Sequence, residues 1–151
     1  MRSLGLQEHI HFLGFQRVEA LMPQIGLVVL SSISEALPLV LLEGYAAGVP
    51  TVTTDVGSCR QLVEGLDDED RALGHSGMVV PIADPQRLAD AALALLGDTA
   101  AWQAASQAAI ARVERYYTDT LMFARYRKVY ETALERRPPA PHAPGDPAWQ
   151  A

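Results

Sequence analysis

Cysteine and positive charge are both scarce in this 151-residue sequence. Its one cysteine, Cys59, can form no disulfide within the chain, and it gives no indication of a cysteine-based zinc cluster. Acidic residues outnumber basic ones, so the net charge is −6 and the pI is near 5.1. Because nucleic acid requires a basic surface, we expect no nucleic-acid partner.

Long apolar runs and a leader pattern are also missing from the sequence. The longest apolar run, residues 36–42, is far too short to cross a bilayer and contains a proline. Residues 1–8 lack the charged and apolar regions of a signal peptide. We therefore expect a cytoplasmic protein.

The overall composition is that of an ordinary globular protein, with 49% hydrophobic and 20% charged residues. A chain of this length predicts one domain with a core of its own. Residues 137–151 contain five prolines and few apolar side chains, which is typical of a disordered tail. We therefore predict a folded domain over 1–136 and a disordered tail over 137–151.

Strand and helix patterns alternate along the first half of the chain. Strands are predicted at 10–13, 26–30, 49–53 and 77–80, and helices at 17–24, 38–47 and 59–63. This order predicts an α/β, Rossmann-like parallel sheet with right-handed crossovers. The acidic segment 64–76 is predicted to be a loop. Beyond residue 84 we predict only C-terminal helices, over 84–96, 99–116 and 118–136.

Ligands of such sheets bind at the carboxyl ends of the strands, near helix N-termini. The predicted loops at that edge are 13–16, 31–37 and 54–58. Glu35 precedes a predicted helix start, and Glu43 is the only charge within that helix. An apolar helix is normally buried, and a buried carboxylate requires a partner. Glu43 could therefore serve a structural contact or accept hydrogen bonds from ligand hydroxyls, and the helical rise predicts roughly 8–12 Å between the two carboxylates.

The Glu35-x(7)-Glu43 spacing and its flanks resemble family 4 glycosyltransferases, which are retaining enzymes of the GT-B type. The resemblance covers 4–135 and includes LGLQEHIHFLGF, VVLSSISEALPLVLLEGYAAGVPTVTTDVGS and GMVVPIADPQRLADAALALL in the family's order. It implies a partial C-terminal, donor-binding domain. Within the family, SISEALPLV and TDVGSCRQLVEG look most like the cytosolic glycosyltransferases of Pel exopolysaccharide synthesis.

The resemblance also implies a role for individual residues. Glu35 would contact hydroxyls of the donor sugar, and we take it as the catalytic residue. Glu43 would bind the ribose of a uridine nucleotide. The remaining binding positions are Leu39 and Val40 for the diphosphate, Ser34, Ala36 and Leu37 for the sugar, and Gly14 and Phe15 for the base. The sequence has Ala36-Leu37-Pro38 where the commoner family pattern has Gly-Phe-Gly.

No cofactor and no metal are expected beside the UDP-sugar donor. The run 67–70 imitates a metal-binding Asp-x-Asp motif, but an acidic run in a loop is usually solvated. Helix-end N–H groups can hold a diphosphate without a cation. The histidines at 9, 11 and 75 have no ligand-like spacing.

The implied reaction moves a sugar from a UDP-sugar to a growing polysaccharide or glycan acceptor. The resemblance implies an acceptor domain upstream of Met1, with cationic groups for the leaving diphosphate, and possible partners in a membrane synthase. On this interpretation the chain alone binds UDP weakly and catalyses nothing. Two alternatives stay open: an epimerase or phosphorylase of the same architecture, and a non-catalytic nucleotide-sugar-binding module.

Overall fold

The structure is a computed structural model, and it describes residues 4–135. The chain divides into two compact units, Met1–Arg115 and Tyr116–Ala151. The predicted tail over 137–151 lies outside the described residues. No helix in the described part of the chain has the length and apolarity to span a membrane.

The first unit is built on a parallel sheet of three strands in the order β1-β2-β3. The strands are β1 (Val28–Leu30), β2 (Thr51–Thr54) and β3 (Gly77–Val80). Val29 lies opposite Val52, and Thr53 lies opposite Val79. All four residues of the central strand β2 are buried, as expected for a parallel strand covered on both faces. The predicted α/β parallel fold is therefore confirmed.

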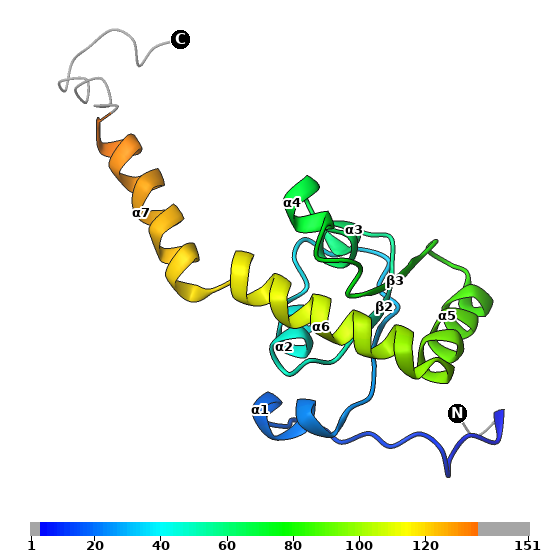
Figure 1. The fold of residues 1–151 in the computed structure, drawn as a ribbon. Helices are drawn as coiled ribbons and strands as arrows, with labels where there is room; N and C mark the ends of the chain where they lie inside the picture. The colour runs from blue at the N-terminus through cyan, green and yellow to red at the C-terminus, as the bar shows by residue number, and fades with distance from the viewer. Residues whose placement is uncertain (1–3, 136–151) are drawn as a thin grey trace, which may run out of the picture. The chain divides into compact units, whose positions relative to one another are not determined.

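Helices connect and cover these strands (Figure 1). The helices of the first unit are α1 (Val18–Leu21), the 3-10 helix η2 (Met22–Gln24), α2 (Leu39–Ala46), α3 (Cys59–Glu64), α4 (Asp68–Arg71), α5 (Pro85–Gly97) and α6 (Thr99–Tyr116). The helix α7 (Asp119–Glu135) belongs to the second unit. Asp84 caps α5 through the N–H of Arg87, and Pro85 occupies its first turn.

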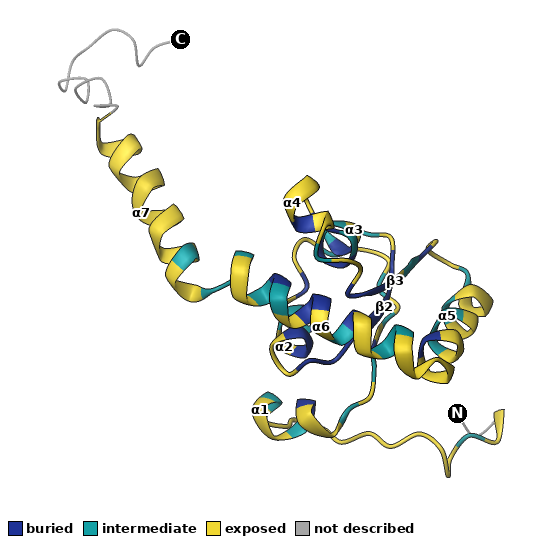
Figure 2. Cartoon of the chain, in the orientation of Figure 1, coloured by how far each residue is buried: buried dark blue, intermediate teal, exposed yellow. Residues whose placement is uncertain are grey.

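The apolar core lies between β2 and the helices α5 and α6. Val52, Leu95 and Ala105 form a buried cluster, and Figure 2 shows the buried positions gathered on the strands and on the inner faces of the helices. Small side chains on α6, including Ala105 and Ala109, allow close packing. Trp102 at the edge of this cluster donates its indole N–H to the carbonyl of Gly26 at 2.6 Å. These contacts hold α6 against the sheet.

Two local expectations are wrong. Residues 10–13 form no strand; Ile10, Phe12 and Leu13 are exposed, so the segment has neither a ladder partner nor a packing face. The expected loop 64–76 contains α4, because Asp67 accepts a hydrogen bond from the N–H of Asp70 and caps a short helix. An acidic first turn is favourable at the positive end of a helix.

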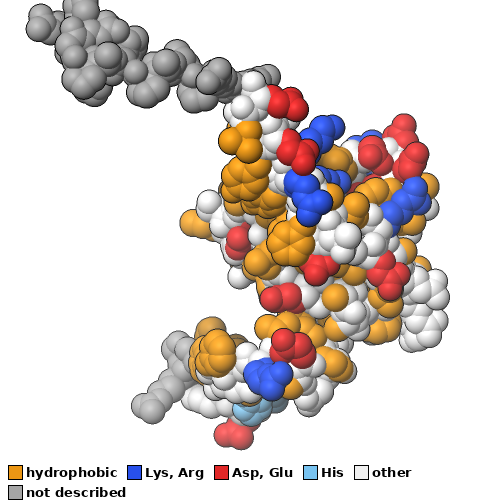
Figure 3. Space-filling view, turned by 90° about the vertical axis from the view of Figure 1, so that its left-hand side faces the viewer, with side chains coloured by type: hydrophobic (Ala, Val, Ile, Leu, Met, Phe, Trp, Pro, Cys, Tyr) orange, Lys and Arg blue, Asp and Glu red, His pale blue; other side chains and the backbone are white. Residues whose placement is uncertain are grey.

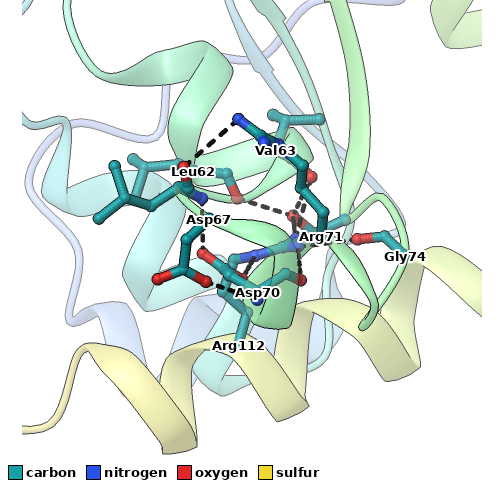
Figure 4. A network of polar contacts seen from close by, with 9 residues as sticks. Leu62, Val63, Asp67, Asp70, Arg71, Gly74 and Arg112 are labelled. Carbon is teal, nitrogen blue, oxygen red and sulfur yellow. Dashed lines mark hydrogen bonds and ion pairs between the residues drawn. The ribbon is translucent and has the colours of Figure 1, made fainter.

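A buried polar network fixes this α4 segment to α6 (Figure 4). Arg112 of α6 has no exposed surface, and Asp70 is 1% exposed. The guanidinium donates to Asp70 Oδ1 at 2.6 Å, and its other donors reach Ser76 Oγ and the carbonyls of Val63, Asp70 and Gly74 at 2.8–3.0 Å. All five N–H donors of the guanidinium are therefore used.

The described part of the second unit, residues 116–135, consists of the end of α6, a short link and the helix α7. None of its side chains is buried within the described residues. Hydrophobic side chains stand along it among charged ones (Figure 3): Met122, Phe123, Tyr126, Val129, Tyr130 and Leu134.

Candidate functional site

The loops after β1 and β2 meet at the carboxyl edge of the sheet. Ser58 binds the carbonyl of Ala36 twice, through its N–H at 3.0 Å and through its Oγ at 2.7 Å. Gly57 has a φ of +52°, and a Cβ added there would lie 2.1 Å from the carbonyl oxygen of Glu35. Only glycine permits this approach. The turn after β2 therefore holds the peptide units of Glu35 and Ala36.

Glu35 is half-buried in the loop between β1 and α2. Its Oε1 accepts a hydrogen bond from Ser32 Oγ at 2.7 Å. No other hydrogen bond or ion pair reaches this carboxylate from residues 4–135, so most of its acceptor capacity is free. The buried Thr54 of β2 donates in turn to the carbonyl of Ser32.

Glu43 differs from its expected state: it is exposed, and within 4–135 it has no partner. The α2 helix packs through Leu41, Gly44 and Tyr45, which are buried, whereas Glu43 belongs to an exposed stripe with Leu39 and Ala46. The expectation of a buried, partnered carboxylate was wrong because an apolar composition does not show which face of a helix packs. The alternative of a structural salt bridge with Glu43 therefore finds no support within the described residues.

The N-terminus of α2 lies between the two glutamates. The helix begins at Leu39, and Pro38 precedes it without any side-chain cap. The first N–H groups of a helix have no acceptor within it, so those of Leu39 and Val40 are available to an anion. Leu39 is exposed and Val40 is half-buried.

The other predicted sugar-binding positions lie in the same loop. Ser34, Ala36 and Leu37 are all exposed, on either side of Glu35. Seven of the nine predicted site residues are thereby continuous along one loop and one helix start, over 34–43.

The remaining two predicted positions, Gly14 and Phe15, lie on an exposed segment. Gly14 has a φ of +66°, and Phe15 is 96% exposed. The side-chain hydrogen bond of this segment is local, from Gln16 to the carbonyl of Leu13. The structure does not join this segment to the loop over 34–43 by a hydrogen bond, and its role with the base stays a prediction.

Sequence reasoning missed the residues that support the loop: Ser32, Thr54, Gly57 and Ser58. The sequence predicted 54–58 at the ligand edge, with Ser58 as the cap of the following helix; in the structure Ser58 makes no side-chain cap bond to that helix and binds the carbonyl of Ala36 instead. The signal that could have found them is the glycine after β2, because a glycine in the predicted loop 54–58 allows a tight turn.

The arginine that follows the turn after β2, Arg60, is already paired with two carboxylates of this chain. Arg60 of α3 binds Asp55 Oδ2 at 2.7 Å and Glu64 Oε1 at 2.6 Å, all three side chains being partly exposed. Hydrogen bonding to Asp55, and secondarily the charges of both carboxylates, raises the pKa of Arg60. Arg60 is thus a paired surface cation. Within the described residues, no group of three or more His, Cys, Asp or Glu side chains is placed to hold a metal ion.

Comparisons with known sequences match this chain to glycosyl transferases. The family model described as "Glycosyl transferases group 1" matches residues 1–98. An exopolysaccharide phosphotransferase of Streptomyces coelicolor is 32% identical over 139 residues, covering 91% of this chain and 14% of that protein. The N-acetyl-alpha-D-glucosaminyl L-malate synthase of Bacillus anthracis is 27% identical over 135 residues, or 89% of this chain and 33% of the synthase. The chain thus spans a third or less of these curated relatives.

Solved structures share the fold. Sucrose-phosphate synthase from Thermosynechococcus elongatus superposes with a TM-score of 0.77 at 22% identity, covering 89% of this chain and 33% of that one. The C-terminal domain of LpcC, a glycosyl transferase group 1 protein of Francisella tularensis, superposes with a TM-score of 0.64 at 24% identity, covering 78% of this chain and 58% of that one. Anabaena HepE, solved with UDP and glucose, superposes with a TM-score of 0.71 at 26% identity, covering 86% of this chain and 34% of HepE.

The three-stranded parallel sheet matches the Rossmann-like C-terminal domain of the GT-B glycosyltransferases. The family model covers well over half of the chain, and the Streptomyces relative extends the match to most of it. This chain belongs to the group 1 family of glycosyl transferases.

Proposed function

We propose that this chain is the donor-binding part of a retaining glycosyltransferase that moves a sugar from a UDP-sugar to a growing polysaccharide or glycan acceptor. The observation that carries the proposal is the edge over 34–43. There Glu35 with free acceptor capacity, an uncapped helix N-terminus and Glu43, which has no partner within 4–135, follow one another. HepE, which shares the fold, was solved with UDP and with UDP-glucose.

Each part of the edge suits one part of a UDP-sugar. The helix N-terminus at Leu39 and Val40 carries partial positive charge and free N–H donors, which suit a diphosphate. Glu43 is a free acceptor on the exposed stripe of α2 and would take the ribose hydroxyls. Glu35 would take hydroxyls of the sugar, with Ser34, Ala36 and Leu37 beside it. Gly14 and Phe15 would contact the uracil.

The reaction requires the diphosphate to leave with its growing negative charge stabilised. The helix terminus contributes a fixed, preorganised positive potential to that stabilisation, which acts without reorganisation during the reaction. No metal ion is part of the proposal, because the N–H groups replace it. The acceptor and the other groups at the leaving oxygen are assigned to the remainder of a longer protein.

The acceptor class rests on resemblance rather than on geometry. The Streptomyces relative is named for exopolysaccharide, and the segments around Glu35 and Gly57 look like those of cytosolic Pel glycosyltransferases. We therefore propose an exopolysaccharide acceptor and a cytoplasmic site of action.

Titration of the ¹⁵N-labelled chain with UDP tests the donor site. We expect the amide shifts to map to Phe15, Glu35, Leu39 and Glu43, because these residues address base, sugar loop, phosphate and ribose. The amides around Arg112 of α6, whose side chain contacts Asp70 and the segment before β3, serve as the internal control and should not move. Shifts at Arg112 with none at Leu39 would overturn the assignment, and sugar transfer by this chain alone would show that the catalytic groups lie elsewhere.

A further inference from the structure

Ser32 holds the Glu35 carboxylate from three residues upstream. Its Oγ donates to Glu35 Oε1 at 2.7 Å, and both side chains are half-buried. We propose that Ser32 is a positioning residue, which fixes this carboxylate for the sugar and thereby sets the preference of the site for a UDP-sugar over UDP. This inference rests on the proposed function and refines it.

The backbone of Ser32 is anchored to the sheet. The hydroxyl of Thr54 donates to the carbonyl of Ser32 and lies 3.5 Å from that of Leu30. Thr54 is 4% exposed and ends β2, which has a parallel partner on each side. A β-branched side chain in a strand has few rotamers, so this hydroxyl has a defined direction. The upstream end of the loop is therefore fixed by the central strand.

The downstream end of the same loop is fixed by the next turn. Ser58 gives two donors to the carbonyl of Ala36, and Gly57 allows the turn to lie against the carbonyl of Glu35. Glu35 thus lies between two anchors, both contributed by residues that end or follow β2. These anchors hold the backbone on both sides of Glu35, and the Ser32 hydroxyl restricts where its carboxylate lies.

This restriction concerns the sugar contact and leaves the nucleotide contacts alone. Glu43 and the N-terminus of α2 make no hydrogen bond with Ser32. A carboxylate already oriented for its ligand need not be ordered during binding, which favours affinity. Loss of the Ser32 hydroxyl should therefore weaken binding of a UDP-sugar more than binding of UDP. A general loosening of the fold would weaken both equally.

Calorimetric titration of the 151-residue chain with UDP and with UDP-glucose tests the proposal. Ser32→Ala should lower the affinity for UDP-glucose relative to UDP by about tenfold, the usual scale for one hydrogen bond to a charged group. Ser32→Thr keeps the hydroxyl and should restore the ratio. The matched control is Ser31→Ala: Ser31 is the exposed neighbour, without a partner in 4–135, and its removal should leave the ratio unchanged.

The possible outcomes separate this inference from the proposed function. If UDP binds but the ratio is the same in Ser32→Ala, or if both ligands weaken equally, the positioning role is wrong and the donor site stands. If neither ligand binds the unaltered chain, the donor site and the positioning role both fail. Should Ser32→Ala unfold, the same titrations are made with Thr54→Val and Thr54→Ser, which change the residue that holds Ser32. The affinity for UDP-glucose relative to UDP should then fall only in Thr54→Val, because Thr54→Ser keeps the hydroxyl.

Discussion

Two carboxylates of the first unit, Asp70 and Glu43, have opposite surroundings. Asp70 is 1% exposed and accepts from Arg112 at 2.6 Å and from the N–H of Leu66 at 2.9 Å. Glu43 is exposed and has no partner within residues 4–135. Each oxygen of the buried carboxylate has a donor from the chain itself, which we call saturated, whereas the exposed carboxylate is left with its full acceptor capacity. The presence or absence of partners within the chain thus distinguishes Asp70, which serves the fold, from Glu43, which we assign to a ligand.

The saturated region should contribute most to stability. Arg112→Ala leaves the Asp70 carboxylate buried without its partner, which typically costs about 3–5 kcal/mol of the free energy of unfolding. Urea denaturation measures this loss. The matched control is Arg115→Ala on the same helix, whose exposed pair with Glu69 should contribute about 0–1 kcal/mol. Equal losses in the two variants would show that burial gives the Arg112 contact no special weight.

The unsaturated region should contribute to binding instead. Glu43→Ala removes an exposed, unpartnered side chain, so the free energy of unfolding should hardly change. UDP affinity should fall about tenfold, because the ribose hydroxyls lose a charged acceptor. Calorimetry measures the affinity, and the control is Glu114→Ala, at an exposed glutamate of α6 that has no partner among the described residues. Undiminished UDP affinity in Glu43→Ala would refute its assignment to the ribose.

The smallest effect on UDP binding is expected from the exposed members of the acidic run over 67–70. Its exposed member Asp68 pairs with Arg71 at 3.3 Å, and Asp67 caps α4, so these carboxylates serve local structure. UDP affinity should therefore be the same in EDTA as in magnesium, and the same in Asp68→Ala. A large gain with magnesium that disappears in Asp68→Ala would instead make the run a metal site.

Short-range patterns in the sequence were sufficient for the main elements of the fold. The continuous apolar run at 26–30 correctly predicted a strand, because a parallel strand is buried on both faces, and the strands predicted at 49–53 and 77–80 are also found. Residues 10–13 are also mostly apolar but pair with no strand in the described part of the chain. Whether such a segment joins the sheet depends on tertiary contacts, which the local sequence does not show. The acidic helix α4 has no apolar period, so its cap at Asp67 was the one signal of its presence.

Long-range contacts could not be predicted, and they decide which charges are buried. Asp70 and Arg112 are 42 positions apart, and no periodicity connects them. Glu43 was expected to be buried because its helix is apolar on all sides, yet α2 packs with one face only. The site residues over 34–43 share one short segment, so their proximity follows from the sequence. Their support by Thr54 and Ser58 does not, because one of those residues ends a different strand, β2, and the other follows it.

The arginine that joins α6 to the segment before β3 also determines how that segment moves. A surface stretch such as 64–76 would ordinarily open on its own, far more often than the protein unfolds. Here the carbonyls of Val63, Asp70 and Gly74 all accept from one side chain of α6. Opening the stretch therefore breaks the contacts of a core helix. The N–H of Leu66, which binds the same aspartate, should exchange with solvent at the rate of the core and not at that of a loop.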